Sequence, residues 1–396
     1  MLKHRDALTS NASDRAVASN NLTEQILTFK YALRPRKRQY ETLEAVSEQQ
    51  RQIYNACLES RVDFYRKTGK TLSYFDQAKQ MTELRKEQEF SALPVKLHRA
   101  TLQRIDRAFK GFFSRIKRGK KAGFPRFKSR NRWSGFGFSE FSGITLKDDK
   151  LSFKGMNGKL HVHMHRPMPQ SKILSCQFVK DVKGWHVCFQ VRVPIAPLEP
   201  TGRSIGIDVG LKEFVVASSG EKISNPRHFR KHERELRRRQ RHMARCKKGS
   251  NGRKKAREAV ARVHLKIKNA RSTFLHQASA RLVRENDLIA IEDLNVKGLS
   301  SGMLAKSVND AGLAQFSEYL AYKAVKAGRE LVKVDPRYTT QACSGCGVIV
   351  PKKLSDRWHL CPECGSSLDR DHNAALNILG RSGSTLAQRK EMSYAC

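Results

Sequence analysis

The sequence predicts a multidomain fold in which a mainly β domain, interrupted by a helical block, precedes an α/β domain. Residues 133–193 alternate between apolar and polar side chains, which is typical of half-buried antiparallel strands. Beyond them, short apolar strand patterns are separated by long helical patterns, as in α/β domains. Two Cys-x-x-Cys pairs near the C-terminus indicate a small metal-binding module within the second domain.

The length and composition allow two or three domains. The chain has 396 residues, of which 39% are hydrophobic and recur in periodic blocks. We therefore expect disorder only in an N-terminal tail at residues 1–24 and a C-terminal tail at residues 381–396. Residues 1–20 lack the apolar segment of a secretory signal, which predicts an intracellular protein.

The charge balance predicts a polyanionic partner. Lys and Arg number 77 against 37 Asp and Glu, a formal net charge of +40. Phosphate backbones favour such an excess because binding releases their counterions, so we expect tight, salt-dependent binding to nucleic acid. A ribosomal-type binding protein and a membrane-surface protein are the alternatives. The absence of any stretch of about 20 apolar residues argues against a membrane partner.

The first domain is expected to be a β-barrel built from two parts of the chain. Ile26–Leu33 is rich in β-branched and aromatic residues, as a strand is, and residues 39–117 then carry apolar stripes at helical spacing. Because Ile26–Leu33 is the only earlier strand, we expect it to join the sheet of residues 133–193. The predicted parts are the barrel at residues 25–36 and 119–198, and a helical subdomain inserted at residues 37–118.

The second domain is predicted to follow the element order of an RNase H-like α/β fold: a strand pair, helices, a strand, a helix, a strand and a helix. Leu288–Ile291 is entirely apolar, the profile of a strand buried on both faces. The other expected elements, after a linker at Pro194–Gly202, are strands at Ser204–Val209, Phe214–Ser218 and Leu331–Val334 and a helix at Ala311–Ala327.

A long basic segment lies within this domain. Residues 227–271 have a helical pattern with 19 Lys or Arg against three Glu, interrupted near residues 249–252. A solvated helix face is the ordinary explanation of a charge run, but an excess of this size repels itself unless a polyanion lies beside it. Contact with nucleic acid is the favoured interpretation.

Three acidic residues end or begin predicted elements of the second domain. Asp208 and Glu292 each end an apolar strand, and Asp371 shares a helical face with Ala375 and Ile378. Three carboxylates that meet repel one another unless cations lie between them, and carboxylate oxygens suit Mg²⁺ or Mn²⁺. Two such ions about 4 Å apart catalyse phosphodiester hydrolysis, so the sequence predicts a metal-dependent nuclease with Asp208, Glu292 and Asp371 as its catalytic metal ligands.

Other interpretations of these acids stay open. The three can be unrelated structural carboxylates, and the strand before Asp208 can also belong to a phosphate-binding site of the actin-like kind. No Gly-rich phosphate loop accompanies that strand, which argues against the second interpretation. Asp293 and Asp369 are close neighbours of Glu292 and Asp371 in the chain and are the residues most easily confused with them.

The paired cysteines predict one structural Zn²⁺. Cys-x-x-Cys units at Cys343/Cys346 and Cys361/Cys364 are separated by 14 residues, and a glycine follows each unit, as in zinc knuckles. A thioredoxin-like redox pair is the alternative, but it does not require a second unit. A closed site of four cysteines is structural rather than catalytic, so the ribbon is expected to brace the region of Asp371 or to touch nucleic acid.

These motifs together resemble the TnpB proteins of insertion-sequence transposons, which are related to type V CRISPR effectors. The resemblance rests on GIDVG around Asp208, IEDL around Glu292, the pairs CSGC and CPEC, and LDRDHNAALNI around Asp371. Looser similarities are YRKTGKTLSY (Tyr65–Tyr74), FKGFF (Phe109–Phe113) and GFPRFK (Gly123–Lys128), so about residues 26–380 are covered.

The resemblance implies an RNA-guided DNA endonuclease with a guide RNA derived from the transposon. It implies that one RuvC site with two Mg²⁺ ions cleaves both strands of target DNA beside a short flanking motif, and that one protein acts per RNA, in the cytoplasm and nucleoid of a prokaryotic cell. The implied parts are a wedge barrel, a recognition subdomain, a RuvC domain at residues 199–340 and 367–380, and a zinc ribbon at residues 341–366. The residues placed near the flanking motif are Tyr74, Lys96, Arg99 and Thr101.

Two functions of other classes remain alternatives. A non-cleaving RNA-guided DNA-binding regulator is disfavoured because all three acids are present. A transposase or resolvase of RNase H-like fold is disfavoured by the four-cysteine ribbon between Glu292 and Asp371.

Overall fold

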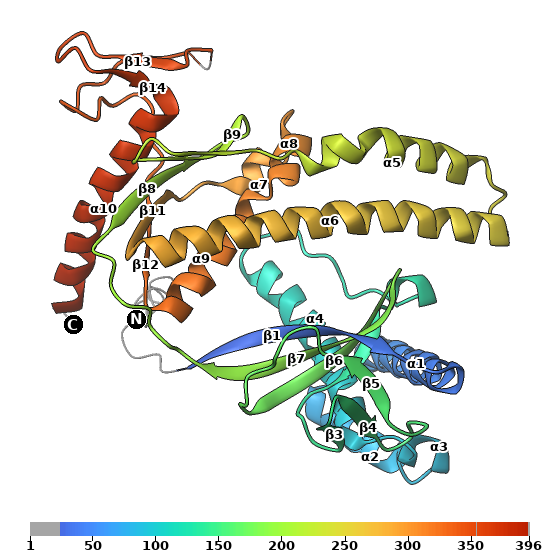
Figure 1. Cartoon of the computed structure of the whole chain (residues 1–396). Coiled ribbons are helices and arrows are strands. Elements are labelled where there is room, and N and C mark those ends of the chain that lie inside the picture. Colours follow the sequence, from blue (N-terminus) through green and yellow to red (C-terminus); the bar gives the residue numbers. More distant parts are fainter. Residues whose placement is uncertain (1–23, 354, 395–396) are drawn as a thin grey trace, which may run out of the picture. The chain divides into compact units, whose positions relative to one another are not determined.

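The described residues form two compact units. The structure is a computed structural model that describes residues 24–353 and 355–394. One unit is Glu24–Val193 and the other begins at Pro194 (Figure 1). The N-terminal tail predicted at residues 1–24 lies outside the described residues except for Glu24, which begins the first strand.

The first unit contains a seven-stranded sheet in the order β2-β6-β7-β1-β5-β4-β3. The early strand lies between β7 and β5, so the prediction that it joins the later strands is confirmed. Because β2 and β3 end the hydrogen-bonded order, closure into a barrel stays a prediction. The strands are β1 (Glu24–Arg34), β2 (Gly135–Phe138), β3 (Ile144–Lys147), β4 (Lys150–Phe153), β5 (Leu160–His163), β6 (Ile173–Asp181) and β7 (Gly184–Pro194).

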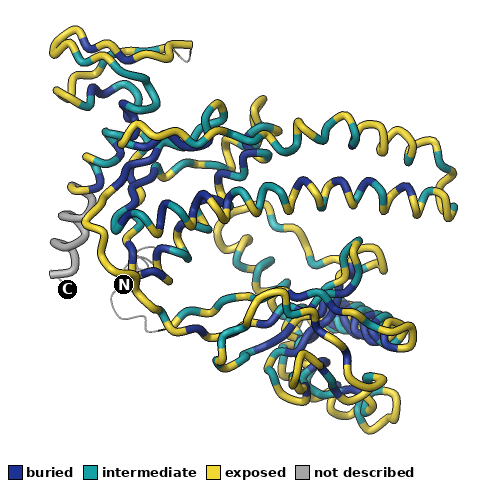
Figure 2. Tube along the Cα trace, in the orientation of Figure 1, coloured by how far each residue is buried: buried dark blue, intermediate teal, exposed yellow. Residues whose placement is uncertain are grey.

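The core of this unit is aromatic. The rings of Phe136 and Phe178 stack with centroids 4.8 Å apart, and Trp185 lies beside Phe136 at 5.8 Å. Along β7 the inward side chains are buried at every second position, as the alternating sequence predicts (Figure 2). Leu43 and Leu97, on two of the helices between β1 and β2, pack into the same core.

Four helices connect β1 to β2: α1 (Lys37–Thr68), α2 (Tyr74–Leu84), α3 (Gln88–Ser91) and α4 (Val95–Lys117). A buried polar network joins α1 to α4, because Gln50 lies 3.1 Å from His98 Nδ1 and accepts a 2.7 Å hydrogen bond from the Thr101 hydroxyl. A short 3-10 helix, η1 (Arg130–Arg132), precedes β2. These polar groups are satisfied within the helical layer, which fixes how the two long helices pack.

The second unit contains a five-stranded mixed sheet in the order β10-β9-β8-β11-β12. The three strands β8, β11 and β12 run parallel, and β8, β9 and β10 form an antiparallel meander. Its strands are β8 (Ser204–Val209), β9 (Glu213–Ala217), β10 (Lys222–Ser224), β11 (Leu288–Glu292) and β12 (Glu330–Val334). Its helices are α5 (His228–Arg245), α6 (Asn251–Glu285), α7 (Val296–Leu299), α8 (Ala305–Ala311), α9 (Leu313–Ala327) and α10 (Arg370–Tyr394).

Helices cover both faces of this sheet. One face packs against α6 and α9, through the side chains Ile205, Ile207, Ile289 and Ile291. On the other face Ala290 and Val332 form a cluster with Ile378 of α10. Strand alternation therefore sends the odd-numbered residues of β8 and β11 to α6 and α9, and the even-numbered ones to α10.

The helix expected at Ala311–Ala327 is confirmed as α9 with the same end, but it begins two residues later, at Leu313. Gly312 adopts a left-handed conformation (φ 73°) that ends α8 at Ala311. The C-terminal tail expected from residue 381 is instead a continuation of α10 as far as Tyr394.

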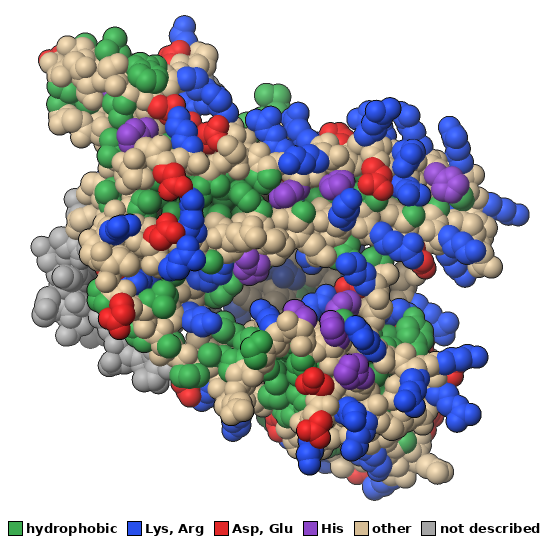
Figure 3. All heavy atoms as spheres, viewed as in Figure 1, with side chains coloured by type: hydrophobic (Ala, Val, Ile, Leu, Met, Phe, Trp, Pro, Cys, Tyr) green, Lys and Arg blue, Asp and Glu red, His purple; other side chains and the backbone are tan. Residues whose placement is uncertain are grey.

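The basic segment of the second unit forms a pair of packed helices. α5 and α6 share a small core of Leu236, Val260, Val263 and Ile267. Lys and Arg side chains project along this pair in Figure 3. Within the described part of the chain, every helix is too short or too polar to span a lipid bilayer.

Candidate active site and cysteine cluster

The ends of two parallel strands bring Asp208 and Glu292 together. β8 and β11 are paired in register up to Ile207 and Ile291, so the next residue of each strand is the acid. Paired residues of adjacent parallel strands lie about 4.8 Å apart and project on the same side. Both carboxylates are even-numbered, so both lie on the sheet face that α10 covers.

Asp371 reaches this face from the first turn of α10. The helix can approach β8 because Gly206 has no side chain: a Cβ there would lie 2.2 Å from the Ala375 carbonyl oxygen. His372 also contacts the strand layer, with its Nε2 atom 3.1 Å from the Ser218 carbonyl oxygen. The close packing of α10 on β8 therefore sets where Asp371 stands relative to Asp208.

The three carboxylates are close enough for the charges of Glu292 and Asp371 to act on Asp208. Burial, and after it the negative charges of Glu292 and Asp371, raise the pKa of Asp208 to about 8. Burial also raises the pKa of Glu292, although a hydrogen bond from Thr339 opposes the shift. Such mutual repulsion is relieved when a cation lies among the oxygens, so this is a candidate site for a divalent metal ion.

The two neighbouring acids have other partners. Asp293 is 66% exposed and pairs with Lys333 at the surface. Asp369 accepts the backbone N–H groups of Asp371 and His372 and so caps α10. Burial raises the pKa of Asp369, but the hydrogen bond from Lys222 and the two N–H groups outweigh it and lower the pKa overall. Neither acid appears among the charges that raise the pKa of Asp208.

Three residues that the sequence reasoning did not single out support this site. The Thr339 hydroxyl donates to Glu292 Oε1 at 2.5 Å, and the Asn377 side chain donates to the carbonyl oxygens of Thr339 and Ala342. Asn373 also donates to Ala342 and accepts the N–H of Ser344. Polar asparagines at buried positions of the last helix pattern were a usable signal, whereas nothing in the pattern around Thr339 marks it.

The four cysteines of the expected ribbon converge. The sulfur atoms of Cys343, Cys346, Cys361 and Cys364 all lie within 4.8 Å of one another. In the described ranges this is the one group of three or more potential metal ligands that converges so closely. A tetrahedral zinc ion with Zn–S bonds of about 2.3 Å separates its sulfurs by about 3.8 Å, so the donor set fits this metal.

The backbone turns after each cysteine pair also have the conformation of zinc knuckles. Gly347 and Gly365 have φ angles of 81° and 70°, the left-handed conformation expected of the glycine after each Cys-x-x-Cys unit. The strands β13 (Trp358–Leu360) and β14 (Ser367–Asp369) pair on either side of the second cysteine unit, and β14 leads directly into α10.

The residues expected near a flanking DNA motif are not equivalent. Arg99 is exposed, while Lys96 is half-buried and pairs with Glu140. Tyr74 packs partly against the core between α1 and α4. Thr101 is only 4% exposed and donates its hydroxyl hydrogen bond to Gln50. The prediction of DNA contact is therefore wrong for Thr101, which is a core residue.

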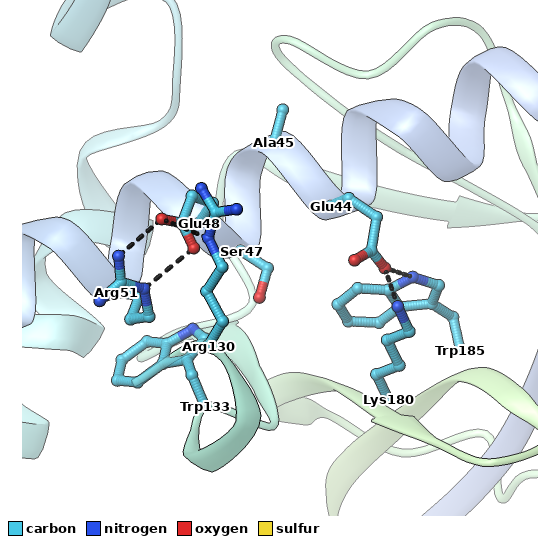
Figure 4. Close-up of a pocket in the computed structure, with 9 residues that line it drawn as sticks. All are labelled: Glu44, Ala45, Ser47, Glu48, Arg51, Arg130, Trp133, Lys180 and Trp185. Carbon is cyan, nitrogen blue, oxygen red and sulfur yellow. Dashed lines mark hydrogen bonds and ion pairs between the residues drawn. The ribbon is translucent and has the colours of Figure 1, made fainter. Parts of the chain in front are cut away.

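A hollow of about 370 Å³ lies in the first unit between α1, η1 and the β6–β7 hairpin (Figure 4). Most of its charged side chains are engaged with one another: Glu48 binds Arg51 and Arg130, and Glu44 binds Lys180. The hollow contains no cluster of acids that could replace the carboxylates of the other unit as a nuclease site.

Family comparisons agree with the two halves of the second unit. A family model described as "Probable transposase" (OrfB_IS605) matches residues 186–302. A second model, "Cas12f1-like, TNB domain", matches residues 314–378. The first match contains Asp208 and Glu292, and the second contains the four cysteines and Asp371.

Individual relatives extend the similarity over about nine tenths of the chain. A Streptomyces pristinaespiralis protein named "Putative RNA-guided DNA endonuclease" is 36% identical over 89% of this chain and 88% of its own length. InsQ of Escherichia coli, given the same description, is 26% identical over 92% of this chain and 94% of its own length. Among solved structures, a Cas12f1–sgRNA–target DNA complex shares the fold with a TM-score of 0.58 at 15% identity, covering 86% of this chain and 82% of that chain.

Proposed function

Since the chain belongs to the TnpB family, we propose that it is an RNA-guided DNA endonuclease of an IS605-type transposon. It cleaves double-stranded DNA beside a short flanking motif through one site made by Asp208, Glu292 and Asp371. The observation that carries this proposal is the shared electrostatic field of three carboxylates from β8, β11 and α10. Named relatives described as RNA-guided DNA endonucleases support the substrate class.

The chemistry proposed for the site is phosphodiester hydrolysis. Two Mg²⁺ ions at this site would supply an activated water and stabilise the leaving 3′ oxygen. The three carboxylates would hold the ions, and a neighbouring side chain orients two of the three carboxylates. Thr339 fixes one oxygen of Glu292, and the Arg370 guanidinium donates to Asp371 Oδ1 at 3.1 Å. These contacts leave the remaining carboxylate oxygens to act as ligands.

We propose a structural Zn²⁺ for Cys343, Cys346, Cys361 and Cys364. The support is their convergence and the two left-handed glycines. Asn373 and Asn377 link the segment before and within the first cysteine pair to α10. The ribbon therefore braces the helix that carries Asp371, without taking part in catalysis.

The partners proposed are a transposon-derived guide RNA and its double-stranded DNA target. In guided nucleases base pairing reads the sequence, while the protein binds backbones and a short duplex motif. The net charge of +40 and the basic α5–α6 pair suit such a role. By the same proposal the first unit holds the wedge and recognition parts, with Tyr74, Lys96 and Arg99 near the flanking motif, and the second holds the RuvC nuclease domain.

One experiment tests the central claim. The protein is purified with RNA expressed from its own locus, that RNA is sequenced, and cleavage of a matching duplex library is measured with Mg²⁺. Wild type should cut only matched targets, Asp208→Ala should not cut, and Asp293→Ala, which removes the neighbouring exposed acid, should cut like wild type. Cutting that needs no matching RNA, or full activity of Asp208→Ala, would overturn the proposal.

A further inference from the structure

A cluster of phenylalanines ends the last helix of the inserted block. Phe109, Phe112 and Phe113 lie in the last turns of α4, and Phe124 packs on them from the following loop. The ring centroids of Phe124 lie 5.7 Å from Phe109 and 5.3 Å from Phe112, and Phe112 and Phe113 are 5.2 Å apart. We call these four residues the phenylalanine cluster.

The cluster is only partly a core. Phe113 is 44% exposed and Phe124 is 49% exposed, although Phe is normally among the buried residues. Phe127, three residues further along the loop, is 55% exposed. Anchoring the loop to α4 explains the buried halves of these rings. It does not explain why about half of each of these three rings is left exposed within fifteen residues of chain, which is typical of interaction surfaces.

The segment that carries the cluster is strongly basic. Residues 107–132 contain eleven Lys or Arg and no Asp or Glu. Asp106, one turn before Lys110, is the acid beside the cluster, and it pairs with Lys110 and Arg61. Exposed aromatic rings among cations form the standard surface for single-stranded nucleic acid, because unpaired bases stack on the rings while phosphates meet the charges. A duplex hides its base faces and so cannot use the rings in this way.

The loop that carries Phe124 is held rigidly. Its end is tied to α1, since Asn55 exchanges hydrogen bonds with the N–H and carbonyl of Lys128 at 2.8 and 3.0 Å, and Arg51 donates to the same carbonyl at 2.7 Å. Its start is tied to α4 through Arg115, which donates to the Gly123 carbonyl. A surface fixed before binding loses little entropy when it receives a ligand.

A second observation lies beside this anchor. Arg51 also lines the hollow of Figure 4, in which Trp133 is 9% exposed. The Trp133 indole N–H is buried and has no hydrogen-bond acceptor among the described residues. A buried donor of this kind is ordinarily satisfied by an ordered water or by a ligand atom.

We propose that unpaired bases of the guide RNA stack on the rings of the phenylalanine cluster. That the partner is a guide RNA rests on the function proposed above. RNA is favoured over the displaced DNA strand because the guide stays bound throughout the reaction cycle. A partner that is always present covers the exposed rings in the resting complex, whereas displaced DNA exists only after a target has been opened.

The test compares matched substitutions in RNA binding by the full-length protein. The double variant Phe113→Leu/Phe124→Leu keeps apolar volume but removes the rings, and Phe75→Leu makes the same change at a 78% exposed ring on α2. The probes are an unstructured RNA of about 16 nucleotides, a DNA of the same sequence and an RNA hairpin. We expect the double variant to bind the unstructured RNA about tenfold or more weakly, while Phe75→Leu binds as wild type does.

Several outcomes overturn the proposal. The first is that the double variant binds the unstructured RNA with the affinity of wild type. The second is that its affinity for the hairpin falls by the same factor as its affinity for the unstructured RNA. The third is that only its affinity for DNA falls. Photo-crosslinking of wild type to its co-purified RNA avoids any folding defect of a variant: the RNA should attach to the peptide around Phe124, and attachment exclusively elsewhere contradicts the proposal. If wild type binds no RNA at all, the proposed function fails first; if it binds RNA and the variants do not differ, only the stacking surface fails.

Discussion

The Thr339 hydroxyl donates a 2.5 Å hydrogen bond to Glu292 Oε1, so a residue from the segment before the cysteine cluster holds a proposed metal ligand. Thr339 is 1% exposed, and its backbone carbonyl accepts a hydrogen bond from Asn377 of α10. One residue thus connects the end of β11 with the helix that carries Asp371. We regard Thr339 as a positioning residue rather than a catalytic one.

Replacing Thr339 with Val should lower the cleavage rate without loss of RNA binding. Valine keeps the shape of the side chain but leaves Glu292 without its donor, and loss of such a partner of a metal ligand costs about 10- to 100-fold in activity or metal affinity. The rate should fall at saturating target and recover partly at high Mg²⁺. Thr339→Ser, which retains the hydroxyl, is the control and should restore most of the rate. Equal rates for wild type and Thr339→Val would contradict this role.

Removing the charge of Asp208 should stabilise the Mg²⁺-free protein at neutral and alkaline pH. The pKa of this carboxyl is raised to about 8 in the fold, against an ordinary value near 4. A raised folded pKa favours the native state below the unfolded pKa, and that contribution is lost as the pH rises through about 8. In buffer without Mg²⁺, and with the zinc of the ribbon left in place, wild type should therefore melt at progressively lower temperature between acidic pH and pH 8.

The Asp208→Asn variant should lack this component of the pH dependence and melt above wild type at about pH 8.5 in buffer without Mg²⁺. Added Mg²⁺ should raise the melting temperature of wild type, because it binds the native state, and should raise that of Asp208→Asn much less. Melting curves at several pH values, with and without Mg²⁺, provide the measurement. An identical pH profile for both proteins would count against a shared carboxylate site.

Adding a methyl group at Gly206 should displace α10 from β8. The Cβ of Gly206→Ala would lie 2.2 Å from the Ala375 carbonyl oxygen and 2.7 Å from the Leu379 backbone nitrogen, both atoms that cannot rotate away. Overpacking of this kind costs about 1–3 kcal/mol of folding free energy. We expect a lower unfolding midpoint in denaturant and a lower cleavage rate. Gly302→Ala is the matched control, since no atom lies within 4 Å of its added Cβ.

The arrangement of the acids could be predicted because it depends on simple periodicities. An apolar strand that ends in an acid places the carboxylate at a sheet edge, and parallel neighbours bring two such ends together. Asp371 follows from the helical spacing to Ala375 and Ile378, both fully buried. Thr339 could not be found in this way, because it lies in a loop where no period constrains side-chain direction.

The errors also have particular physical reasons. Thr101 is spaced four residues from both Leu97 and Ile105, so the helical stripe predicted burial and should have outweighed the family resemblance. The start of the helix expected at Ala311–Ala327 is two residues too early, because the left-handed conformation of Gly312, which ends α8, leaves no mark in the apolar pattern. The basic and polar residues after Leu379 resemble a tail, yet α10 continues through them to Tyr394.

Replacing Cys361 with Ser should remove the metal from the ribbon and weaken the nuclease site at a distance. Cys361 is 2% exposed, and its sulfur lies 3.5 Å from that of Cys346. A structural zinc site contributes its binding free energy to folding, so the variant should carry no zinc by atomic absorption and melt at a lower temperature. The Asn373 and Asn377 contacts to Ala342 depend on the same segment, so cleavage should also fall.

The matched control is Cys246→Ser at the α5–α6 junction, where the thiol donates a hydrogen bond to the His242 carbonyl oxygen and lies outside the four-cysteine cluster. That variant should keep one zinc per chain and wild-type cleavage. Zinc content and melting that are unchanged in Cys361→Ser would refute the metal site. If zinc is lost but the cleavage rate is unchanged, the four-cysteine segment folds independently of Asp371 and Glu292. The contacts of Asn373 and Asn377 would then not couple the fold of the ribbon to the position of the carboxylates.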